Sequence, residues 1–214
     1  MITETVGIMT TRTPARGLPV FLAAALRQPH LVGAVVPSSR DLGRQLATVV
    51  PRQGSPVVVE LGPGTGAVSE VIDRRLPPGG RHLAVEINPR MAEHLRRRHP
   101  AMSVLCGDAA ELDTLLAGVG AARVEAVVSG LPWSLFGEDL QRRVLAQVCG
   151  ALGPGGGFST FAYRHASRLA GAQRFRALLD IFFDEVIVTR TVWRNLPPAL
   201  VYVCRRPVGP GAHA

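Results

Sequence analysis

Lysine is absent from the sequence. All 24 of its basic residues are arginines, and they outnumber 16 acidic residues to give a formal net charge of +8. Together with the abundance of alanine, glycine and proline, the absence of lysine is typical of a GC-rich coding sequence, which explains the choice of arginine but not the excess of positive charge. A net charge of this size favours anionic partners such as a nucleic acid or an acidic membrane surface, although a basic enzyme without such a partner fits it too.

Cysteine is scarce as well. Cys106, Cys149 and Cys204 are far apart, show no C-x-x-C spacing and fall within apolar segments. This pattern argues against a disulfide framework and a cysteine metal site, and it fits the reducing conditions of the cytoplasm. His94 and His99 are five positions apart with arginines between them, so we expect structural residues on a solvated surface. No metal site is predicted.

The chain has no uninterrupted apolar run long enough to cross a membrane. Its longest apolar region, Leu18–Val36, contains Arg27 and Pro29, whereas a transmembrane helix needs roughly 20 apolar residues in succession. Residues 1–14 lack the basic start and apolar core of a secretory signal, and we expect them to be flexible. With 214 residues and 47% hydrophobic content, one well-packed domain is expected.

The most informative stretch is Val57–Gly66. It begins with apolar, β-branched residues that predict a buried strand, and it continues into a turn with glycine at positions 62, 64 and 66. Glycine allows a tight turn and lets the backbone come within van der Waals reach of a ligand, which a Cβ atom would block. Residues 67–72 then have the apolar spacing of a helix. A strand, a glycine turn and a helix in this order place a nucleotide-like ligand at a helix N-terminus, although such a turn is often no more than a turn.

The spacing of the glycines narrows the type of ligand. Dinucleotide-binding loops have the pattern G-x-G-x-x-G, whereas Gly62, Gly64 and Gly66 form G-x-G-x-G, with the acidic Glu60 two positions before the first glycine. This stretch resembles motif I of the class I S-adenosylmethionine-dependent methyltransferases. The resemblance implies that S-adenosylmethionine is the cofactor and that the loop wraps its methionine part and ribose. It also implies that Glu60 and the three glycines belong to the cofactor site.

Two further acidic side chains are expected at the ends of neighbouring strands. Glu86 ends the predicted strand 82–86 and lies 24 positions after Gly62, close to the roughly 20 at which a carboxylate can accept hydrogen bonds from ribose hydroxyls. Asp108 follows the predicted strand 103–106, where this class usually keeps an acidic or amide side chain that accepts from the adenine amino group. The alternative role of Asp108 is that of a helix cap. Their neighbours are expected to bind the cofactor as well, and these are Ile87 and Ala109.

The second informative stretch follows the predicted strand 124–128. It reads Ser129-Gly130-Leu131-Pro132-Trp133, and parallel-sheet folds do their chemistry at the carboxyl ends of strands. A proline fixes such a loop, and the flat ring of Trp133 could stack on a cation or a base. Loop packing around a buried tryptophan is the alternative.

The remaining pattern predicts a single α/β domain. Strands at 158–163 and 182–192 continue the alternation with helices, and a final strand at 199–204 follows too closely for a parallel crossover, so it must pair antiparallel. We therefore expect a Rossmann-like sheet of about seven mostly parallel strands within residues 56–206, followed by a flexible tail at 207–214.

Helices are expected ahead of this core, in residues 15–50. One of them has its apolar face between Leu18 and Leu26, and it is either a lid over the site or an interfacial helix whose arginines meet anionic headgroups. The next is capped by Ser38 or Ser39, and its N-terminus could close over the cofactor.

Several short motifs together resemble bacterial phospholipid N-methyltransferases of the PmtA type. They are Pro37-Ser38-Ser39-Arg40, Glu60–Gly66, Glu86-Ile87-Asn88, Gly107-Asp108-Ala109, Ser129–Pro132 and Asn195-Leu196-Pro197-Pro198-Ala199. The resemblance spans roughly residues 18–206. It implies stepwise methylation of the amine of phosphatidylethanolamine by an enzyme that docks reversibly on anionic membrane through a basic N-terminal amphipathic helix. We therefore expect a cytoplasmic protein that associates with the inner face of the membrane.

We also expect particular residues to form the reacting centre, the cofactor site and the acceptor site. The expected catalytic residues, which line the reacting centre, are Leu131, Trp133 and Tyr163. Three serines are expected to contact the cofactor, and they are Ser38, Ser39 and Ser129. The expected acceptor-binding residues, whose arginines are available to a phosphate, are Gly130, Pro132, Arg164, Arg194 and Asn195.

Departures from the family pattern leave other acceptors open. The chain has Thr160–Tyr163 where the family tends to read Gln-Phe-Thr-Tyr, Arg164-His165 replaces a more neutral continuation, and Trp133 replaces an aliphatic residue. A natural-product or peptide amine is therefore one alternative substrate, and a cofactor-binding regulator without catalysis is another possibility. The sequence carries no signal for the oligomeric state.

An rRNA adenine methyltransferase is a further alternative, because that family has a similar motif after the fourth strand and is also basic. Two features oppose it. Ser129-Gly130 offers no side-chain amide to accept from an adenine amino group, and we expect no helical RNA-binding domain after the last strand. Nucleic acid is therefore not the expected partner.

Overall fold

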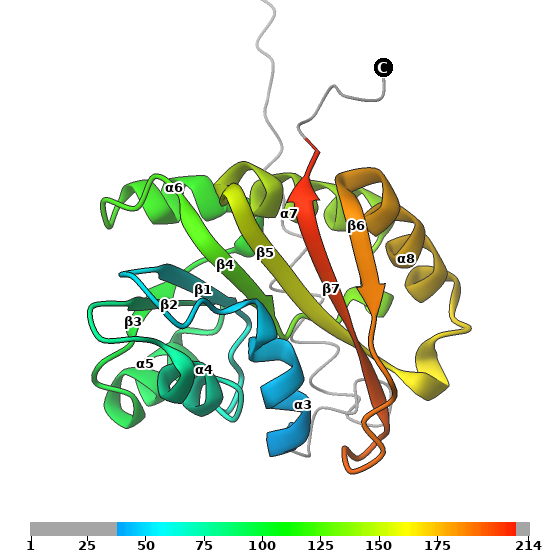
Figure 1. Ribbon diagram of the computed structural model, residues 1–214, viewed down its shortest axis with the longest axis horizontal. Coiled ribbons are helices and arrows are strands. Elements are labelled where there is room, and N and C mark those ends of the chain that lie inside the picture. Colours follow the sequence, from blue (N-terminus) through cyan, green and yellow to red (C-terminus); the bar gives the residue numbers. More distant parts are fainter. Residues whose placement is uncertain (1–37, 209–214) are drawn as a thin grey trace, which may run out of the picture.

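The computed structural model describes residues 38–208, which form a single sheet between two layers of helices (Figure 1). The strands are β1 (Val57–Leu61), β2 (Arg81–Glu86), β3 (Ser103–Cys106), β4 (Val124–Ser129), β5 (Leu152–Tyr163), β6 (Phe183–Val188) and β7 (Ala199–Pro207). The α-helices are α3 (Arg40–Leu46), α4 (Ser69–Arg75), α5 (Pro89–Arg98), α6 (Leu112–Ala117), α7 (Glu138–Ala151) and α8 (Ala170–Phe182). Short 3-10 helices are η1 (Ala47–Val49), η2 (Ala109–Glu111), η3 (Trp133–Leu135) and η4 (Arg164–Ala166).

The seven strands of the described part lie in the order β3-β2-β1-β4-β5-β7-β6. The first five pair in parallel, and β7 runs antiparallel to both β5 and β6. This topology confirms the predicted Rossmann-like sheet with an antiparallel last strand. The reason is the one expected from the sequence, because the connection from β6 to β7 is too short to cross over the sheet.

Both faces of the sheet are covered, which explains why the central strands are apolar along their whole length. One buried cluster joins α3, η1 and α4 to residues such as Val58, Ala126 and Val201. A larger cluster joins α6, α7 and α8 to residues of the opposite face, including Val59 and Val127. Consecutive residues of β1 and β4 therefore contribute to different cores.

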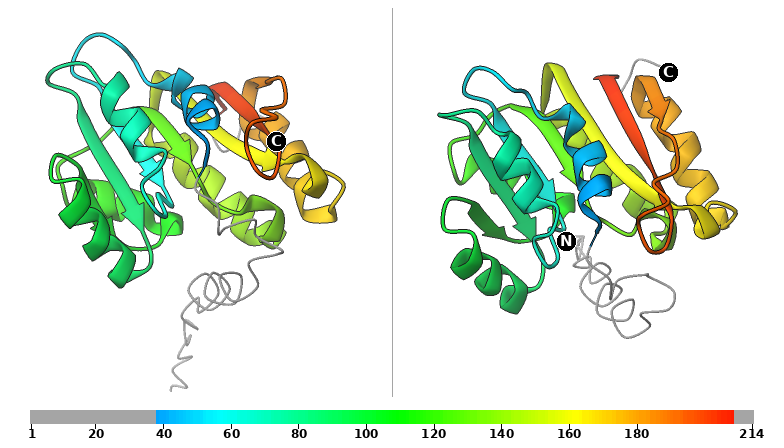
Figure 2. Two further views of the ribbon diagram at one scale, coloured as in Figure 1. Left: turned by 90° about the horizontal axis from the view of Figure 1, so that it is seen from below. Right: turned by 60° about the horizontal axis from the view of Figure 1, so that its bottom comes forward.

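The carboxyl ends of the parallel strands lie at one edge of the sheet, toward the bottom of Figure 1. At this edge α3 lies between α4 and the β6–β7 connection, as Figure 2 shows from below. The β6–β7 connection comprises residues 189–198. Segments from both ends of the described chain therefore meet at the edge where this fold places its ligands.

Three predicted boundaries were wrong. The strand expected at 158–163 begins at Leu152, because the glycine-rich residues 152–157 also belong to β5. There the pairing shifts from Val124↔Leu152 to Ala126↔Gly157 and the extra residues bulge out. The next strand ends at Val188, and Val192 makes only an isolated bridge to Ala199. Residue 207, assigned to the flexible tail, is the last residue of β7.

The predicted flexible segment 1–14 and the predicted helix around Leu18–Leu26 lie outside the described residues. Within residues 38–208, no helix has the length and apolar character needed to span a membrane.

Candidate functional site

The glycine turn after β1 has the backbone conformation that the sequence predicts. Gly62, Gly64 and Gly66 have φ values of 67°, 57° and 83°, in the left-handed region that favours glycine. The Gly62 N–H donates to Val85 O at 2.9 Å, and the Gly66 N–H closes a turn onto Pro63 O at 3.0 Å. The turn is therefore tied to β2 as well as to its own strand.

The loop after β4 packs directly against this turn. The Gly130 N–H donates to Leu61 O at 2.8 Å, and a Cβ atom at residue 130 would lie 2.6 Å from Gly62 O. A Cβ atom at residue 62 would in turn lie 2.9 Å from Leu131 Cδ2. Close approach to the backbone therefore requires glycine at residue 130, whereas the positive φ requires it at residue 62. The Gly130–Leu131 segment forms a wall of the glycine turn.

Gly64 differs from the other two glycines because its open side meets no protein atom. A Cβ atom placed there would have nothing within 4 Å, so the positive φ alone requires glycine. The carboxylate of Glu86 lies beside this position and accepts from the backbone N–H groups of Asn88, Gly64 and Ile87. Burial raises the pKa of Glu86 and these N–H groups partly offset the rise. An open backbone beside a strand-end carboxylate fits the ribose end of an adenosine ligand.

Asp108 lies at the adjacent strand end. The Gly107 N–H donates to Glu86 O at 3.1 Å, which joins the ends of β2 and β3. Asp108 Oδ1 accepts from the Ala110 N–H at 2.8 Å and so caps η2, while the half-buried side chain leaves its other oxygen for a ligand. Ala109 is buried and Ile87 is partly buried against the same core. The cap role and the cofactor role predicted for Asp108 are therefore compatible.

Glu60 lies beneath the glycine turn and is already bound by protein groups. Its side chain is 2% exposed, and Oε2 accepts from Ser69 Oγ, at the start of α4, at 2.6 Å. His82 Nε2, on β2, lies 3.2 Å from the same oxygen. The predicted cofactor role of Glu60 is thus accompanied by a clear structural one, because the side chain holds β1, β2 and α4 together under the loop.

His82 is the centre of a buried charged network. Its Nδ1 lies 2.6 Å from Asp73 Oδ1, and burial, which lowers its pKa, is outweighed by Asp73 and Glu60, so the pKa rises to about 9. His82 is therefore in its positively charged imidazolium form at neutral pH. His99 Nδ1 lies 3.6 Å from Asp73 Oδ2. The network is thus a protonated histidine between two carboxylates, with a second histidine at its edge.

His99 also supports the glycine turn directly. Its Nε2 would be 2.5 Å from a Cβ atom at residue 66, so glycine is needed there for close packing as well as for its positive φ. His99 is 8% exposed, which corrects the prediction that it lies on a solvated surface, whereas His94 is exposed as expected. The arginines that suggested solvation lie on α5, and the chain turns inward after that helix ends.

Trp133 and Ser129 form the interior of the loop after β4. Trp133 is 2% exposed and stacks on Phe175 at a centroid distance of 4.4 Å. Its Nε1–H donates to Ser129 Oγ at 3.1 Å, and the Leu131 N–H donates to the same oxygen at 3.3 Å. The indole therefore faces the core formed with α8, and the Ser129 hydroxyl shapes the loop. Pro132 between them is partly buried.

Tyr163 and Arg164 lie where β5 ends. Tyr163 packs edge-on against Phe161 and stacks beside His165, and burial raises the pKa of its hydroxyl, which keeps it protonated at neutral pH. The Arg164 N–H donates to Pro198 O at 2.9 Å, and its guanidinium lies 5.3 Å from the centre of the Trp193 ring. The end of β5 is therefore joined to the β6–β7 connection.

The N-terminus of α3 is bound to the same connection. Ser39 Oγ accepts from the Leu42 N–H, which confirms Ser39 as the helix cap, and Ser38 is half-buried before it. Asn195 is 3% exposed; its Oδ1 accepts from the Ser39 N–H at 2.9 Å and its Nδ2 donates to Pro197 O. The structure thus brings the Ser-Ser-Arg and Asn-Leu-Pro-Pro motifs together.

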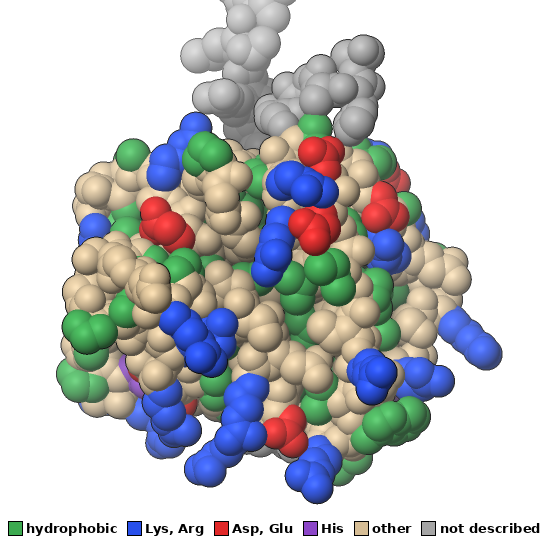
Figure 3. Space-filling model, in the orientation of Figure 1, with side chains coloured by type: hydrophobic (Ala, Val, Ile, Leu, Met, Phe, Trp, Pro, Cys, Tyr) green, Lys and Arg blue, Asp and Glu red, His purple; other side chains and the backbone are tan. Residues whose placement is uncertain are grey.

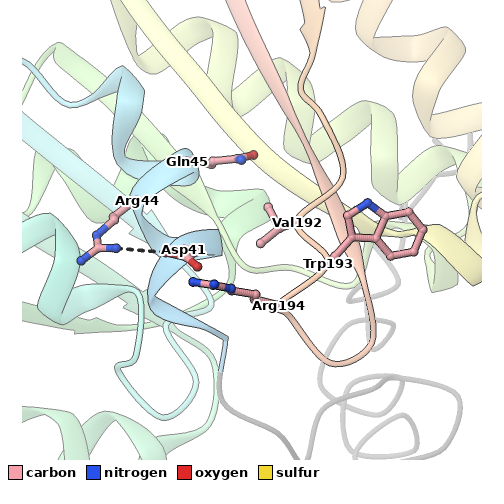
Figure 4. Close-up of a pocket in the computed structure, with 6 residues that line it drawn as sticks. All are labelled: Asp41, Arg44, Gln45, Val192, Trp193 and Arg194. Atoms are coloured by element: carbon pink, nitrogen blue, oxygen red, sulfur yellow. Dashed lines mark hydrogen bonds and ion pairs between the residues drawn. The ribbon is translucent and has the colours of Figure 1, made fainter.

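Arg194 points back toward α3 and helps to line a surface cavity of about 430 Å³ (Figure 4). The other lining residues are Asp41, Arg44, Gln45, Val192 and Trp193. Arg44 pairs with Asp41 at 2.9 Å, whereas Arg194 forms no ion pair within residues 38–208. Arg194 is therefore placed to meet an anionic group entering from this side of α3.

The sequence reasoning missed the residues of the buried network, which are Ser69, Asp73, His82 and His99. A signal was available for one of them. Val58 pairs with His82 in the sheet, so Glu60 and His82 occupy the same face of adjacent strands, and an inward-facing histidine beside an inward-facing glutamate indicates a buried ion pair. The partners on α4 and after α5 depend on helix packing, which the strand pattern does not predict.

Comparisons with known proteins agree with this geometry. Residues 58–156 match the family model described as a methyltransferase domain. The chain is 35% identical over 189 residues to the ornithine lipid N-methyltransferase of Singulisphaera acidiphila, covering 87% of this chain and 94% of that protein. It is 31% identical over 125 residues to ribosomal RNA small subunit methyltransferase A of Geobacter metallireducens, covering 56% of this chain and 42% of that protein.

A solved structure shows the same fold. The O-methyltransferase from Bacillus cereus in complex with SAH has a TM-score of 0.62 at 16% identity, covering 87% of this chain and 91% of that one. The Gly64 opening and the Glu86 carboxylate fit an adenosine-containing ligand in this chain, and S-adenosylmethionine is its cofactor. The chain belongs to the family of S-adenosylmethionine-dependent methyltransferases that contains the ornithine lipid N-methyltransferase of Singulisphaera acidiphila.

Proposed function

We propose that this methyltransferase transfers a methyl group to the primary amine of a lipid headgroup, in phosphatidylethanolamine or in an ornithine lipid. The observation that supports this most strongly is the hydrogen bond between Asn195 and the backbone of Ser39. It joins two of the motifs that resemble phospholipid N-methyltransferases, Ser-Ser-Arg and Asn-Leu-Pro-Pro, at the carboxyl edge of the sheet. The relative from Singulisphaera acidiphila, whose name describes a lipid N-methyltransferase, matches nearly the whole chain.

The proposed cofactor contacts follow from the strand ends. Glu86 accepts from the two ribose hydroxyls, Asp108 accepts from the adenine amino group, and the open backbone at Gly64 lies against the ligand. Glu60 acts from below by holding the turn, and Ser38 and Ser39 approach from the start of α3. The remaining proposed cofactor neighbours are Gly62, Gly66, Ile87, Ala109 and Ser129.

The proposed acceptor site lies between the loop after β4 and the end of β5. Leu131 and Tyr163 line it, and the protonated hydroxyl of Tyr163 is a hydrogen-bond donor or acceptor for the amine. Trp133 contributes as the buried support of the Gly130–Pro132 wall rather than as a stacking surface.

The cofactor supplies a methyl group on a positively charged sulfur, so the new N–C bond forms as the S–C bond breaks and no covalent enzyme intermediate is needed. Alignment of the amine with that methyl group at about 3 Å provides much of the rate enhancement. A primary amine must lose a proton before it can react. The site must favour the neutral amine, whose proton is lost to solvent. The rate should therefore rise with pH. Arg164 and Arg194 are available to a headgroup phosphate.

A ribosomal RNA substrate is the second candidate, because the chain also matches an rRNA methyltransferase over 125 residues. Two features of the loop after β4 oppose an RNA substrate. Gly130 has no side chain to accept from an adenine amino group, and the Ser129 hydroxyl is occupied by Trp133 and Leu131. We therefore rank it below the lipid amine.

The decisive experiment offers several acceptors at once. The protein is incubated with methyl-labelled cofactor and, separately, with phosphatidylethanolamine, an ornithine lipid, a panel of small amines and ribosomal RNA, and labelled products are identified by mass spectrometry. We expect label on the lipid amine. Label only in RNA would contradict the amine mechanism, and label only in a small amine would contradict the lipid substrate.

A further inference from the structure

The β6–β7 connection presents two large apolar side chains to solvent. Trp193 is 68% exposed and Leu196 is 69% exposed, the highest values among the large hydrophobic residues of the described chain. In Figure 4 the Trp193 ring points away from α3, on the side of the connection opposite to Arg194. Exposure of this size has a hydration cost that an isolated protein would avoid, so it suggests contact with a partner.

The connection is held in place rather than loose. Val192 is 6% exposed and pairs with Ala199, and Asn195 is buried with hydrogen bonds to Ser39 N and Pro197 O. Trp193 and Leu196 therefore face outward from a segment that Val192 and Asn195 hold in place. Both side chains are presented without any rearrangement of the fold.

Arginines are frequent in the segments that carry or adjoin these two side chains. Four exposed arginines lie in the connection or after β5, and they are Arg164, Arg168, Arg190 and Arg194. Residues 164–168 and 189–198 contain no Asp or Glu. None of the four arginines forms an ion pair with a carboxylate in the described part of the chain. Figure 3 shows arginine and apolar side chains, with an acidic side chain among them, along the lower edge of the molecule.

The patch, defined as Trp193, Leu196, Arg164, Arg168 and Arg190, lies beside the proposed acceptor site, whereas Arg194 points toward α3 (Figure 4). Arg164 directly follows Tyr163 and stacks over Trp193, and its N–H is bonded to Pro198 O. Asn195, between the two exposed side chains, is bonded to the start of α3. A surface that docks through this patch would therefore face the carboxyl edge of the sheet.

We propose that this patch docks on an anionic lipid bilayer, with Trp193 and Leu196 in the interfacial region and the arginines on lipid phosphates. Tryptophan is enriched at membrane interfaces because its ring is apolar while its N–H remains hydrogen-bonded there. Arginine binds phosphates through paired N–H groups and is attracted to anionic leaflets. This docking rests on the proposed function, because it would bring the site to a lipid substrate. It adds a second membrane contact, separate from the predicted N-terminal helix.

The test uses the two tryptophans of the chain. Trp133 is 2% exposed in the core, so accessible fluorescence comes from Trp193. The full-length protein is mixed with phosphatidylcholine–phosphatidylglycerol vesicles in which the acyl chains of one lipid are brominated, because bromine quenches only nearby indoles. We expect quenching and a blue shift in the wild type and neither in Trp193→Phe, whose remaining emission reports Trp133. Absence of quenching in wild-type protein that co-sediments with vesicles would overturn the proposal.

Binding affinities supply an independent measure. Leu196→Ser should weaken vesicle binding roughly tenfold, and Arg164→Gln should weaken it roughly fivefold at low salt. The matched control is Ile181→Ser, which changes a 46% exposed side chain at the end of α8, away from the carboxyl edge. Equal effects of Leu196→Ser and Ile181→Ser would contradict a specific docking surface.

The vesicles contain no primary-amine lipid, so this experiment does not depend on turnover. A protein that docks but methylates a soluble amine would refute the proposed function and leave the docking surface intact. If ribosomal RNA instead of vesicles protects Trp193 from acrylamide quenching, the patch is a nucleic-acid surface and the proposal is wrong.

Discussion

The backbone N–H of Ser39 donates to Asn195 Oδ1 at 2.9 Å, joining residues that are 156 positions apart in the sequence. Ser39 caps α3 at the start of the described chain, and Asn195 belongs to the connection before its last strand. The contact holds α3 beside the β6–β7 connection, and residues of both segments line the surface cavity that includes Arg194. It is also the contact whose removal should most directly link stability to ligand binding.

Replacing Asn195 with Ala should lower the unfolding free energy by about 2 kcal/mol, because the partly buried Ser39 N–H loses its acceptor. Cofactor affinity should fall in parallel as the start of α3 becomes free to move. Denaturant unfolding and calorimetric titration measure the two effects. Thr191→Ala is the matched control, since it removes only a 3.4 Å contact with Arg164 in the same connection. If Asn195→Ala and Thr191→Ala behave alike, the contact with Ser39 does not organise the site.

A methyl group at residue 130 should be poorly tolerated. A Cβ atom there would be 2.6 Å from Gly62 O, a backbone atom that can move only if the glycine turn moves. We expect Gly130→Ala to lose most cofactor binding and to be destabilised by about 2 kcal/mol. Gly150→Ala is the control, because its Cβ meets nothing within 4 Å and alanine favours the helix α7. Normal cofactor affinity in Gly130→Ala would show that the turn is not rigid.

The Glu86 carboxylate should contribute to cofactor affinity rather than to folding. Burial raises its pKa, so the native state derives little stability from the charge. Glu86→Gln should therefore leave the unfolding midpoint nearly unchanged and weaken S-adenosylmethionine binding by about 10- to 100-fold. Calorimetric titration of this variant beside Glu93→Gln, which changes an exposed residue on α5, is the measurement. An unchanged dissociation constant would remove the proposed contact with the ribose.

Protein stability should fall on the alkaline side of neutrality because of His82. Its folded-state pKa of about 9 lies above the ordinary value of 6.5, so the folded state binds more protons between these two values. The stabilisation is complete below pH 6.5 and is lost as the pH rises through about 9, with a total of roughly 3 kcal/mol.

Urea unfolding of the wild type and of His82→Gln across pH 6 to about 10 tests this prediction. The wild type should lose stability with increasing pH, and the variant should start lower and vary less. The exposed His94→Gln variant should follow the wild type. Parallel pH profiles for wild type and His82→Gln would exclude His82 as the source of the dependence.

The sequence alone determined the strand framework and the conformation of the main turn. Apolar runs such as Val57–Val59 must be buried on both faces, and only glycine readily adopts the positive φ found at Gly62, Gly64 and Gly66. The length of the last connection determined that β7 is antiparallel. The spacing from Gly62 to Glu86 located the carboxylate that lies beside Gly64. Each of these properties depends on residues close together in the chain or on the number of residues between two positions.

Tertiary packing decided what the sequence left open. Trp133 and Trp193 both follow short polar or proline-containing stretches, yet one stacks on Phe175 in the core and the other is 68% exposed. That difference depends on what covers the loop, and Trp133 is covered by Phe175 of α8 together with Phe136 and Phe158. His82 became a protonated centre because α4 carries Asp73 to within 2.6 Å of it. The local sequence determines the backbone conformation and the alternation of buried and exposed residues. The surroundings of a side chain depend instead on which helices and strands pack together in the fold.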